Sequence, residues 1–335
     1  MSLQRSAEPG LLARLLAAAA RGNPVFWIFA VLCAVPVAAR FGAEAYILSL
    51  MTRSLIFAIA ALSLDVILGY GALISFGHAA YFGIGAYAVG ILATHGVDDL
   101  LIQIPVAIAV AVAFAAGTSA ISLRASGVYY ILSTLAFGQM AYFFAVSLSA
   151  YGGDDGLTLA ARSRLLGLRV LANDRLFYYV ALATLGGFFY LAQRIMGSRF
   201  GRVLQGIREN PLRMRANGFE PFFYQLTACT IAGAMGAVAG VLLANQAEFV
   251  SPAYMTWQRS GELLAMVLLG GRGTLWGPIA GASFFLVLEE VLAGFTEQWK
   301  LLFGPILILV ALGGHGGLAG VVGRYRHGNG GGETT

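Results

Sequence analysis

Residues 198–218 form the most strongly basic segment of the chain, with the sequence SRFGRVLQGIRENPLRMRANG. Its arginines could pair with acidic groups of a protein partner or with anionic lipid headgroups. Asn210 suits a helix N-cap, Pro211 the first helical position and Gly218 a C-terminal stop, so the pattern predicts a short helix from Pro211 to Asn217. The segment is a candidate docking surface.

Polar side chains inside long apolar runs are a second group with chemical potential. A charge in hydrocarbon is costly and usually faces a partner or a water-filled path. We interpret Glu289 and Glu290 as charges near the water boundary, and the set contains no ladder of groups for a proton relay. The polar candidates within apolar runs are Arg53, Asp65, His78, Gln139, Glu262, Glu289 and Glu290.

The sequence contains none of the common catalytic motifs. It contains no G-x-S-x-G, H-E-x-x-H or P-loop lysine motif and no cysteine cluster. Cys33 and Cys229 are interpreted as packing residues, and the scattered histidines do not predict a metal site. If the protein performs work, its energy must come from an ion gradient or from a separate ATPase.

The amino-acid composition indicates that most of the chain lies in a lipid bilayer. Of its 335 residues 59% are hydrophobic and only 11% are charged, and the mean hydropathy is +0.78, which is typical of a polytopic membrane protein. The runs lack the alternation of barrel strands, so we predict an all-α fold of about 8–10 transmembrane helices. The apolar runs are 25–41, 46–68, 72–94, 100–122, 128–150, 176–196, 222–245, 261–271, 275–293 and 299–313.

Two glycine-rich stretches, 69–87 and 269–281, interrupt this pattern. Small residues allow close backbone approach, and a helix can break at membrane depth where the freed backbone lines a cavity. The run 261–271 is too short to span alone. We therefore expect broken or re-entrant helices there, which in transporters mark a substrate path, although tight packing alone would also explain the glycines.

Arginine positions predict the orientation of the chain, because basic residues are retained on the cytoplasmic side. With both termini inside and ten spans, 13 arginines lie inside and seven basic residues outside. We interpret the first apolar run as a span rather than a signal peptide. The predicted organisation is a cytoplasmic segment 1–24, a transmembrane domain 25–313 with a periplasmic loop 151–175 and a cytoplasmic loop 194–221, and a cytoplasmic tail 314–335.

Five ordered segments resemble the branched-chain amino acid permeases of ABC importers, in particular the LivM-like subunits. The resemblance covers about residues 46 to 313. Its segments are GYGALISFGHAAYFGIGAY (69–87), SGVYYILSTLAFG (126–138), GGDDGL (152–157), SRFGR with IREN (198–202 and 207–210) and SGELLAMVLLGGRGTLWGP (260–278).

The resemblance implies a type-II-like ABC importer permease fold in the bacterial inner membrane. The implied partners are a homologous LivH-like permease subunit, two cytoplasmic ATP-binding subunits and a periplasmic substrate-binding protein. No cofactor is bound directly, since the partner subunits use the ATP. The coupling residues implied by the resemblance are Arg202, Arg208, Glu209, Asn210, Pro211, Arg213, Arg215 and Gly218.

We expect an alternating-access transporter of branched-chain amino acids or a related small polar solute. An ion-coupled secondary transporter is the main alternative, and a channel or scaffold is a third. The substrate path is predicted near hydrogen-bonding groups beside the broken helices, namely Tyr70, Ser75, His78, Thr134, Gln139, Glu262 and Thr274.

Overall fold

The computed structural model describes residues 24–42, 44–295, 298, 301, 303–305, 317 and 320. The predicted cytoplasmic segment before residue 24, most of the predicted last span 299–313 and nearly all of the predicted tail 314–335 lie outside the described residues.

Helices make up almost all of the regular structure in the described ranges. Two strands of two residues each, β1 (Leu157–Thr158) and β2 (Phe249–Val250), pair antiparallel. The helices are α2 (Pro24–Ala38), α3 (Glu44–Leu68), α4 (His78–Thr94), α5 (Leu100–Ser122), α6 (Val128–Ser147), α7 (Asp174–Gly197), α8 (Arg199–Glu209), α9 (Pro211–Ala216), α10 (Pro221–Ala247), α11 (Trp257–Gly270) and α12 (Gly277–Phe295).

Six of the described helices are long and apolar enough to cross a membrane, namely α3, α5, α6, α7, α10 and α12. The apolar helices Val25–Ala38 and His78–Thr94 are shorter. The all-α polytopic prediction is therefore confirmed. The predicted run 72–94 is helical only from His78, because the residues before it form the first interruption, and the short run 261–271 falls mainly within α11.

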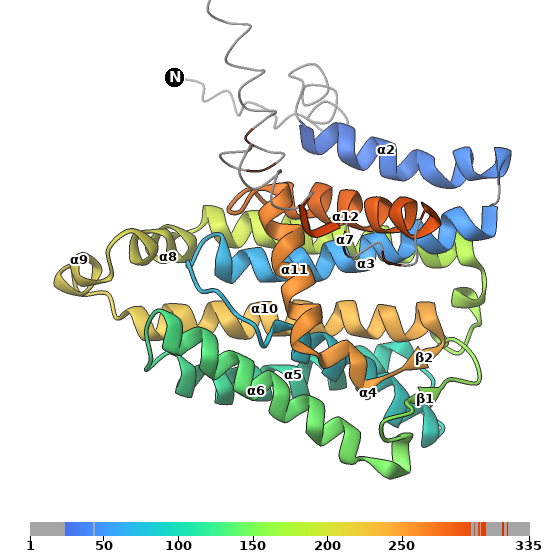
Figure 1. The fold of residues 1–335 in the computed structure, drawn as a ribbon, viewed down its shortest axis with the longest axis horizontal. Coiled ribbons are helices and arrows are strands. Elements are labelled where there is room, and N and C mark those ends of the chain that lie inside the picture. Colours follow the sequence, from blue (N-terminus) through green and yellow to red (C-terminus); the bar gives the residue numbers. More distant parts are fainter. Residues whose placement is uncertain are drawn as a thin grey trace, which may run out of the picture.

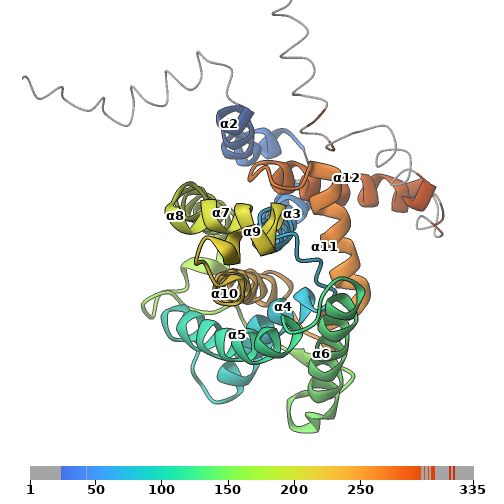
Figure 2. The same cartoon turned by 90° about the vertical axis from the view of Figure 1, so that its left-hand side faces the viewer.

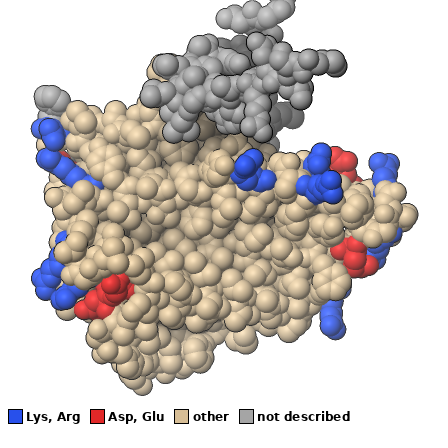
Figure 3. Space-filling view, turned by 180° about the vertical axis from the view of Figure 1, so that it is seen from behind, with Lys and Arg blue, Asp and Glu red and all other residues tan. Residues whose placement is uncertain are grey.

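The long helices lie side by side along one direction, and α11 crosses them nearly at a right angle (Figure 1). Helices α8 and α9 project at one end of the bundle, and β1 and β2 lie at the other. Figure 2 looks along the bundle from the α8–α9 end. Seen from behind, charged side chains gather toward the two ends, and the surface between them is almost free of charge (Figure 3). Such a band suits contact with hydrocarbon.

Helix α10 lies at the centre and packs against α3, α4 and α5. Its crossing with α4 depends on glycine, since a Cβ atom on Gly240 would collide with the carbonyl oxygen of Phe82. Likewise, a Cβ atom on Gly85 would collide with the carbonyl oxygen of Ala237. The two backbones therefore approach more closely than any larger residue allows.

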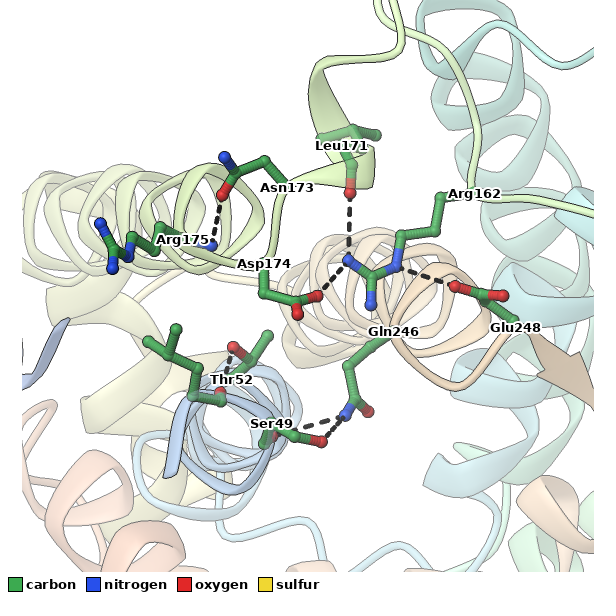
Figure 4. A network of polar contacts seen from close by, with 10 residues as sticks. Ser49, Thr52, Arg162, Leu171, Asn173, Asp174, Arg175, Gln246 and Glu248 are labelled. Atoms are coloured by element: carbon green, nitrogen blue, oxygen red, sulfur yellow. Dashed lines mark hydrogen bonds and ion pairs between the residues drawn. The ribbon is translucent and has the colours of Figure 1, made fainter. Parts of the chain in front are cut away.

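A polar network fixes the long connection between α6 and α7 at the β1–β2 end (Figure 4). Arg162 donates to the carboxylate of Asp174 at 2.6 Å and to the carbonyl of Leu171 at 3.1 Å, and it pairs with Glu248 at 3.2 Å. The same guanidinium lies over the ring of Phe177, 5.2 Å from its centroid. Arg162 thus ties the connection to the start of α7 and the end of α10.

We predict that Gly240→Ala destabilises the protein by roughly 1–3 kcal/mol, because the added methyl group overpacks the α4–α10 crossing. Thermal unfolding of the purified protein in detergent would measure the loss. Gly117→Ala is the matched control, since a Cβ atom there meets nothing within 4 Å and alanine favours a helix. Equal melting temperatures for the two variants would contradict the prediction.

Candidate functional site

Helix α4 begins inside the protein, after the irregular segment Gly69–Gly77, so its first backbone N–H groups need partners other than water. Two neighbouring helices supply them. The hydroxyl of Thr134 on α6 accepts from the N–H of Phe76 at 3.2 Å. The hydroxyl of Ser260 on α11 accepts from the N–H of Ala79 at 3.0 Å. Ser260 therefore caps α4, and Thr134 holds the segment immediately before it.

His78, the first residue of α4, is completely enclosed and contacts α3. Its Nε2 lies 2.8 Å from the hydroxyl of Ser63, which donates its own proton to the carbonyl of Ala60. Nε2 is therefore the protonated nitrogen. Nδ1 has no hydrogen-bond partner in the described part of the chain, and the ring stands edge-on to Tyr81. His78 fixes the start of α4 against α3.

A second interruption separates α11 from α12 at residues 271–276. Gly271 and Gly273 have φ values of +107° and +76°, which residues with a side chain rarely adopt. The hydroxyl of Thr274 donates to the carbonyl of Gly271 at 2.7 Å, and the N–H of Gly277 donates to the carbonyl of Thr274 at 2.7 Å. The segment is a compact turn that leads directly into α12.

The two interruptions touch each other near the α8–α9 end. The buried carboxylate of Asp65, in the last turn of α3, accepts from the N–H of Gly273 at 2.8 Å. A Cβ atom on Gly69 would lie 2.7 Å from the Cα atom of Gly273, so only glycine fits. Displacement of one interruption must therefore move the other.

Arg208, in the last turn of α8, bonds to the first interruption and lies beside the second. Its Nη1 atom donates to the carbonyl of Gly69 and lies 3.5 Å from the position of a Cβ atom on Gly273. Its positive charge also acts on the carboxylate of Asp65. Through Arg208, the projecting α8–α9 unit is bonded to the segment that precedes α4 and lies beside the segment that precedes α12.

Helix α9 is the short helix that the sequence pattern predicts. The side chain of Asn210 accepts from the N–H of Arg213 at 2.9 Å, Pro211 is the first helical residue, and Gly218 has a φ of +83°. The exposed tip carries Leu212, which is 74% exposed. Leu212 stands beside Arg213 in the chain, so the tip presents an apolar and a basic side chain together, a combination that a protein partner can bind.

The other predicted coupling residues lie on the same unit. Arg202 and Glu209 are exposed on α8. Arg215, on α9, forms a loose ion pair of 3.7 Å with Glu220. The structure thus brings these positions together at one end of the bundle, and their coupling role stays a prediction.

The residues predicted to line the path fall into separate places. Three of them surround the start of α4, two lie where the interruptions meet, and Glu262 is paired with Arg259 at 2.6 Å on α11. Gln139 is half-buried on α6. The group at α4 is Ser75, His78 and Thr134, and the group at the interruptions is Tyr70 and Thr274.

Sequence reasoning did not assign a role to several residues that build this site. Ser63 and Ser260 complete the start of α4. Asp65 is a polar candidate from the sequence, but its bond to the second interruption was not expected. Small hydroxyl residues in apolar helices are a weak signal, because most bond their own helix. The buried charge of Asp65 was the one strong signal.

Comparisons with known proteins are consistent with this geometry. A family model described as branched-chain amino acid transport system / permease component matches residues 46–312. No solved structure matches.

Three curated relatives match the chain. Two are high-affinity branched-chain amino acid transport system permease proteins LivM, from Escherichia coli K12 and Salmonella typhimurium. They are 28% and 27% identical over 286 residues, which cover 78% of this chain and 67% of each relative. A probable LivM permease from Methanocaldococcus jannaschii is 27% identical over 133 residues, covering 35% of this chain and 39% of its own length.

We predict that Ser260→Ala weakens the start of α4 by roughly 0.5–2 kcal/mol, because the N–H of Ala79 loses its capping acceptor. Hydrogen exchange by mass spectrometry should show faster exchange in peptides that contain residues 76–80. Ser133→Ala is the control, since that hydroxyl bonds only to its own helix. Unchanged exchange in Ser260→Ala would show that the cap does not hold the segment.

Proposed function

The chain belongs to the family of permease components of branched-chain amino acid transport systems, and from this premise we propose that it works in an ATP-driven, binding-protein-dependent importer. It is a multi-pass membrane protein and a transport subunit, not an enzyme. Its proposed cargo is a branched-chain amino acid or a related small polar solute. Its proposed partners are a homologous permease subunit, two ATP-binding subunits and a binding protein.

The observation that carries this proposal is the hydrogen bond from Arg208 to the first helix interruption, which Asp65 connects to the second. A partner that pushes or pulls on α9 would move α8 and, through Arg208, the carbonyl of Gly69. Because Asp65 bonds to Gly273, the start of α12 would move with it. The chain thus has the parts that an external ATPase needs to reorient α4 and α12 in alternating access.

We place the α8–α9 end in the cytoplasm, since the arginines of residues 199–215 would otherwise lie outside. The arginines between residues 162 and 175 then face the periplasm, against the inside-positive rule. Two of them are neutralised by partners, because Arg162 pairs with Asp174 and Glu248 and Arg175 with Glu44. These pairs support the orientation.

The proposed partner surface on α9 combines an exposed apolar side chain with positive charge. Leu212 projects at the tip, and Arg213 and Arg215 follow within the same short helix. This chemistry fits an apolar groove with an acidic rim on the ATP-binding subunit. A short helix held by a capped start and a glycine stop is stiff enough to transmit a displacement.

We predict that Leu212→Glu lowers the affinity for the ATP-binding subunits at least about tenfold, because a carboxylate replaces an apolar anchor in the interface. Co-purification from detergent would measure the loss. Leu168→Glu is the matched control, since Leu168 is 64% exposed at the opposite end of the bundle. Retention of the ATP-binding subunits by Leu212→Glu would refute this docking surface.

A transport experiment tests the proposed function as a whole. We expect proteoliposomes with the complete importer to take up radiolabelled leucine only when both ATP and the loaded binding protein are present. The chain contains no P-loop lysine motif, so the partner subunits must supply ATP hydrolysis. Uptake should persist when an ionophore dissipates ion gradients. Uptake that survives without ATP and collapses with the ionophore would instead support an ion-coupled transporter.

A further inference from the structure

Four charged residues form a cluster on one face of α3, α11 and α12, which we call the charge cluster. It consists of Arg53, Arg259, Glu262 and Glu289. Arg53 and Glu289 lie 3.9 Å apart with side chains 33% and 19% exposed, and Arg259 and Glu262 lie 2.6 Å apart with side chains 29% and 26% exposed. The guanidinium groups of Arg53 and Arg259 lie over the same ring, that of Phe57, which brings the two pairs together. The four are therefore one electrostatic unit.

The charge cluster lies away from the ends of its long helices. At 1.5 Å per residue, Arg53 is roughly 14 Å from the start of α3 and Glu289 roughly 9 Å from the end of α12. Charges at such depth are expensive unless they face a partner or a water-filled path. Glu289, which we interpret from the sequence as a charge near the water boundary, thus lies inside α12 and not at its end.

Aromatic side chains in the protein interior pack beneath the charge cluster. The guanidinium groups of Arg53 and Arg259 lie 5.7 Å and 5.9 Å from the centroid of the buried Phe57 ring. Phe57 packs in turn against Phe82, and Phe82 against Tyr254. The ring supports both guanidinium groups by cation–π contact, which uses the face of the guanidinium and not its N–H donors.

A purely structural role explains the charge cluster poorly. At 3.9 Å, the pair between Arg53 and Glu289 is at the limit of an ion pair and too long for a hydrogen bond. The pair between Arg259 and Glu262 lies within one helix and joins no two helices. Both pairs are partly exposed among the described residues, so charged groups of both signs are accessible from outside the bundle.

We propose that the charge cluster is a contact site for the charged ends of a zwitterionic α-amino acid, with the arginines binding its carboxylate and the glutamates its ammonium group. Guanidinium groups bind carboxylates in a bidentate manner, and carboxylates accept from an ammonium group. The site rests on the proposed function, because it names the solute chemistry for the same transport path. It adds Arg53, Arg259 and Glu289 to the predicted path residue Glu262.

The first experiment measures leucine uptake and ATP hydrolysis together in proteoliposomes that contain the complete importer. We expect Glu262→Gln and Glu289→Gln to lower leucine uptake per ATP at least about tenfold, the loss of one charged hydrogen bond, while binding-protein-stimulated ATP hydrolysis stays within about twofold of wild type. Glu290→Gln is the matched control, since the neighbouring Glu290 bonds to Tyr46 outside the charge cluster. Wild-type uptake in the glutamate variants, or a parallel loss of uptake and ATP hydrolysis, would overturn the site.

A charge-exchange variant separates ligand binding from a structural ion pair. The double substitution Arg53→Glu with Glu289→Arg keeps the pair but reverses its polarity toward the solute. We expect it to transport leucine as poorly as the single variants. Recovery of wild-type uptake would show that only the pairing matters and would overturn the proposal.

Direct binding distinguishes failure of this site from failure of the proposed function. Saturation-transfer NMR with L-leucine and the purified complex, without ATP or binding protein, should give a signal that Glu262→Gln abolishes and Glu290→Gln keeps. A complex that binds leucine in this way but shows no ATP-driven uptake would refute the importer and retain the site. An importer whose leucine signal and uptake survive Glu262→Gln would refute the site and retain the importer.

Discussion

Every backbone polar group at membrane depth needs a hydrogen-bond partner, and this requirement shapes the protein around the start of α4. A helix that begins inside the bundle exposes N–H groups that neither lipid nor water can satisfy. Here Thr134 on α6 and Ser260 on α11 accept from those groups, and Ser63 on α3 holds the first side chain of α4. The start of α4 is stable because α3, α6 and α11 supply these hydrogen-bond partners. The same bonds hold the three helices in place against α4.

The same requirement links the α8–α9 end to the interior. The interruptions after α3 and after α11 leave backbone groups outside the helical hydrogen bonds. The N–H of Gly273 in the second interruption bonds to Asp65 of α3, and the carbonyl of Gly69 in the first accepts from Arg208 of α8. A displacement of α8 therefore meets a small set of bonds between rigid helices rather than a soft loop. Close packing of α10 against α4 at Gly240 restrains the other side of α4. Such a chain of discrete contacts is a physical route for coupling between the two ends of a transporter.

Two kinds of polar group occupy the apolar part of the bundle, and their partners distinguish them. His78 and Ser63 are enclosed and face each other, so they contribute to the fixed architecture. The charge cluster of Arg53, Arg259, Glu262 and Glu289 is partly exposed. Enclosure is typical of structural polar groups, whereas partly exposed charges within apolar helices usually face a partner or a water-filled path.

Interactions between residues close in the chain allowed much of this structure to be predicted from the sequence. Apolar run length determined the class and most of the long helices, and Asn210, Pro211 and Gly218 determined α9, because capping and proline geometry depend on residues close in the chain. The glycine-rich stretches located both interruptions for the same reason. The partners that complete them depend on contacts across 58 residues for Thr134 with Phe76 and 181 residues for Ser260 with Ala79. Only the tertiary structure decided these pairs, the reach of Arg208 and the assembly of the charge cluster, because helix packing, which no local pattern encodes, brings distant residues together.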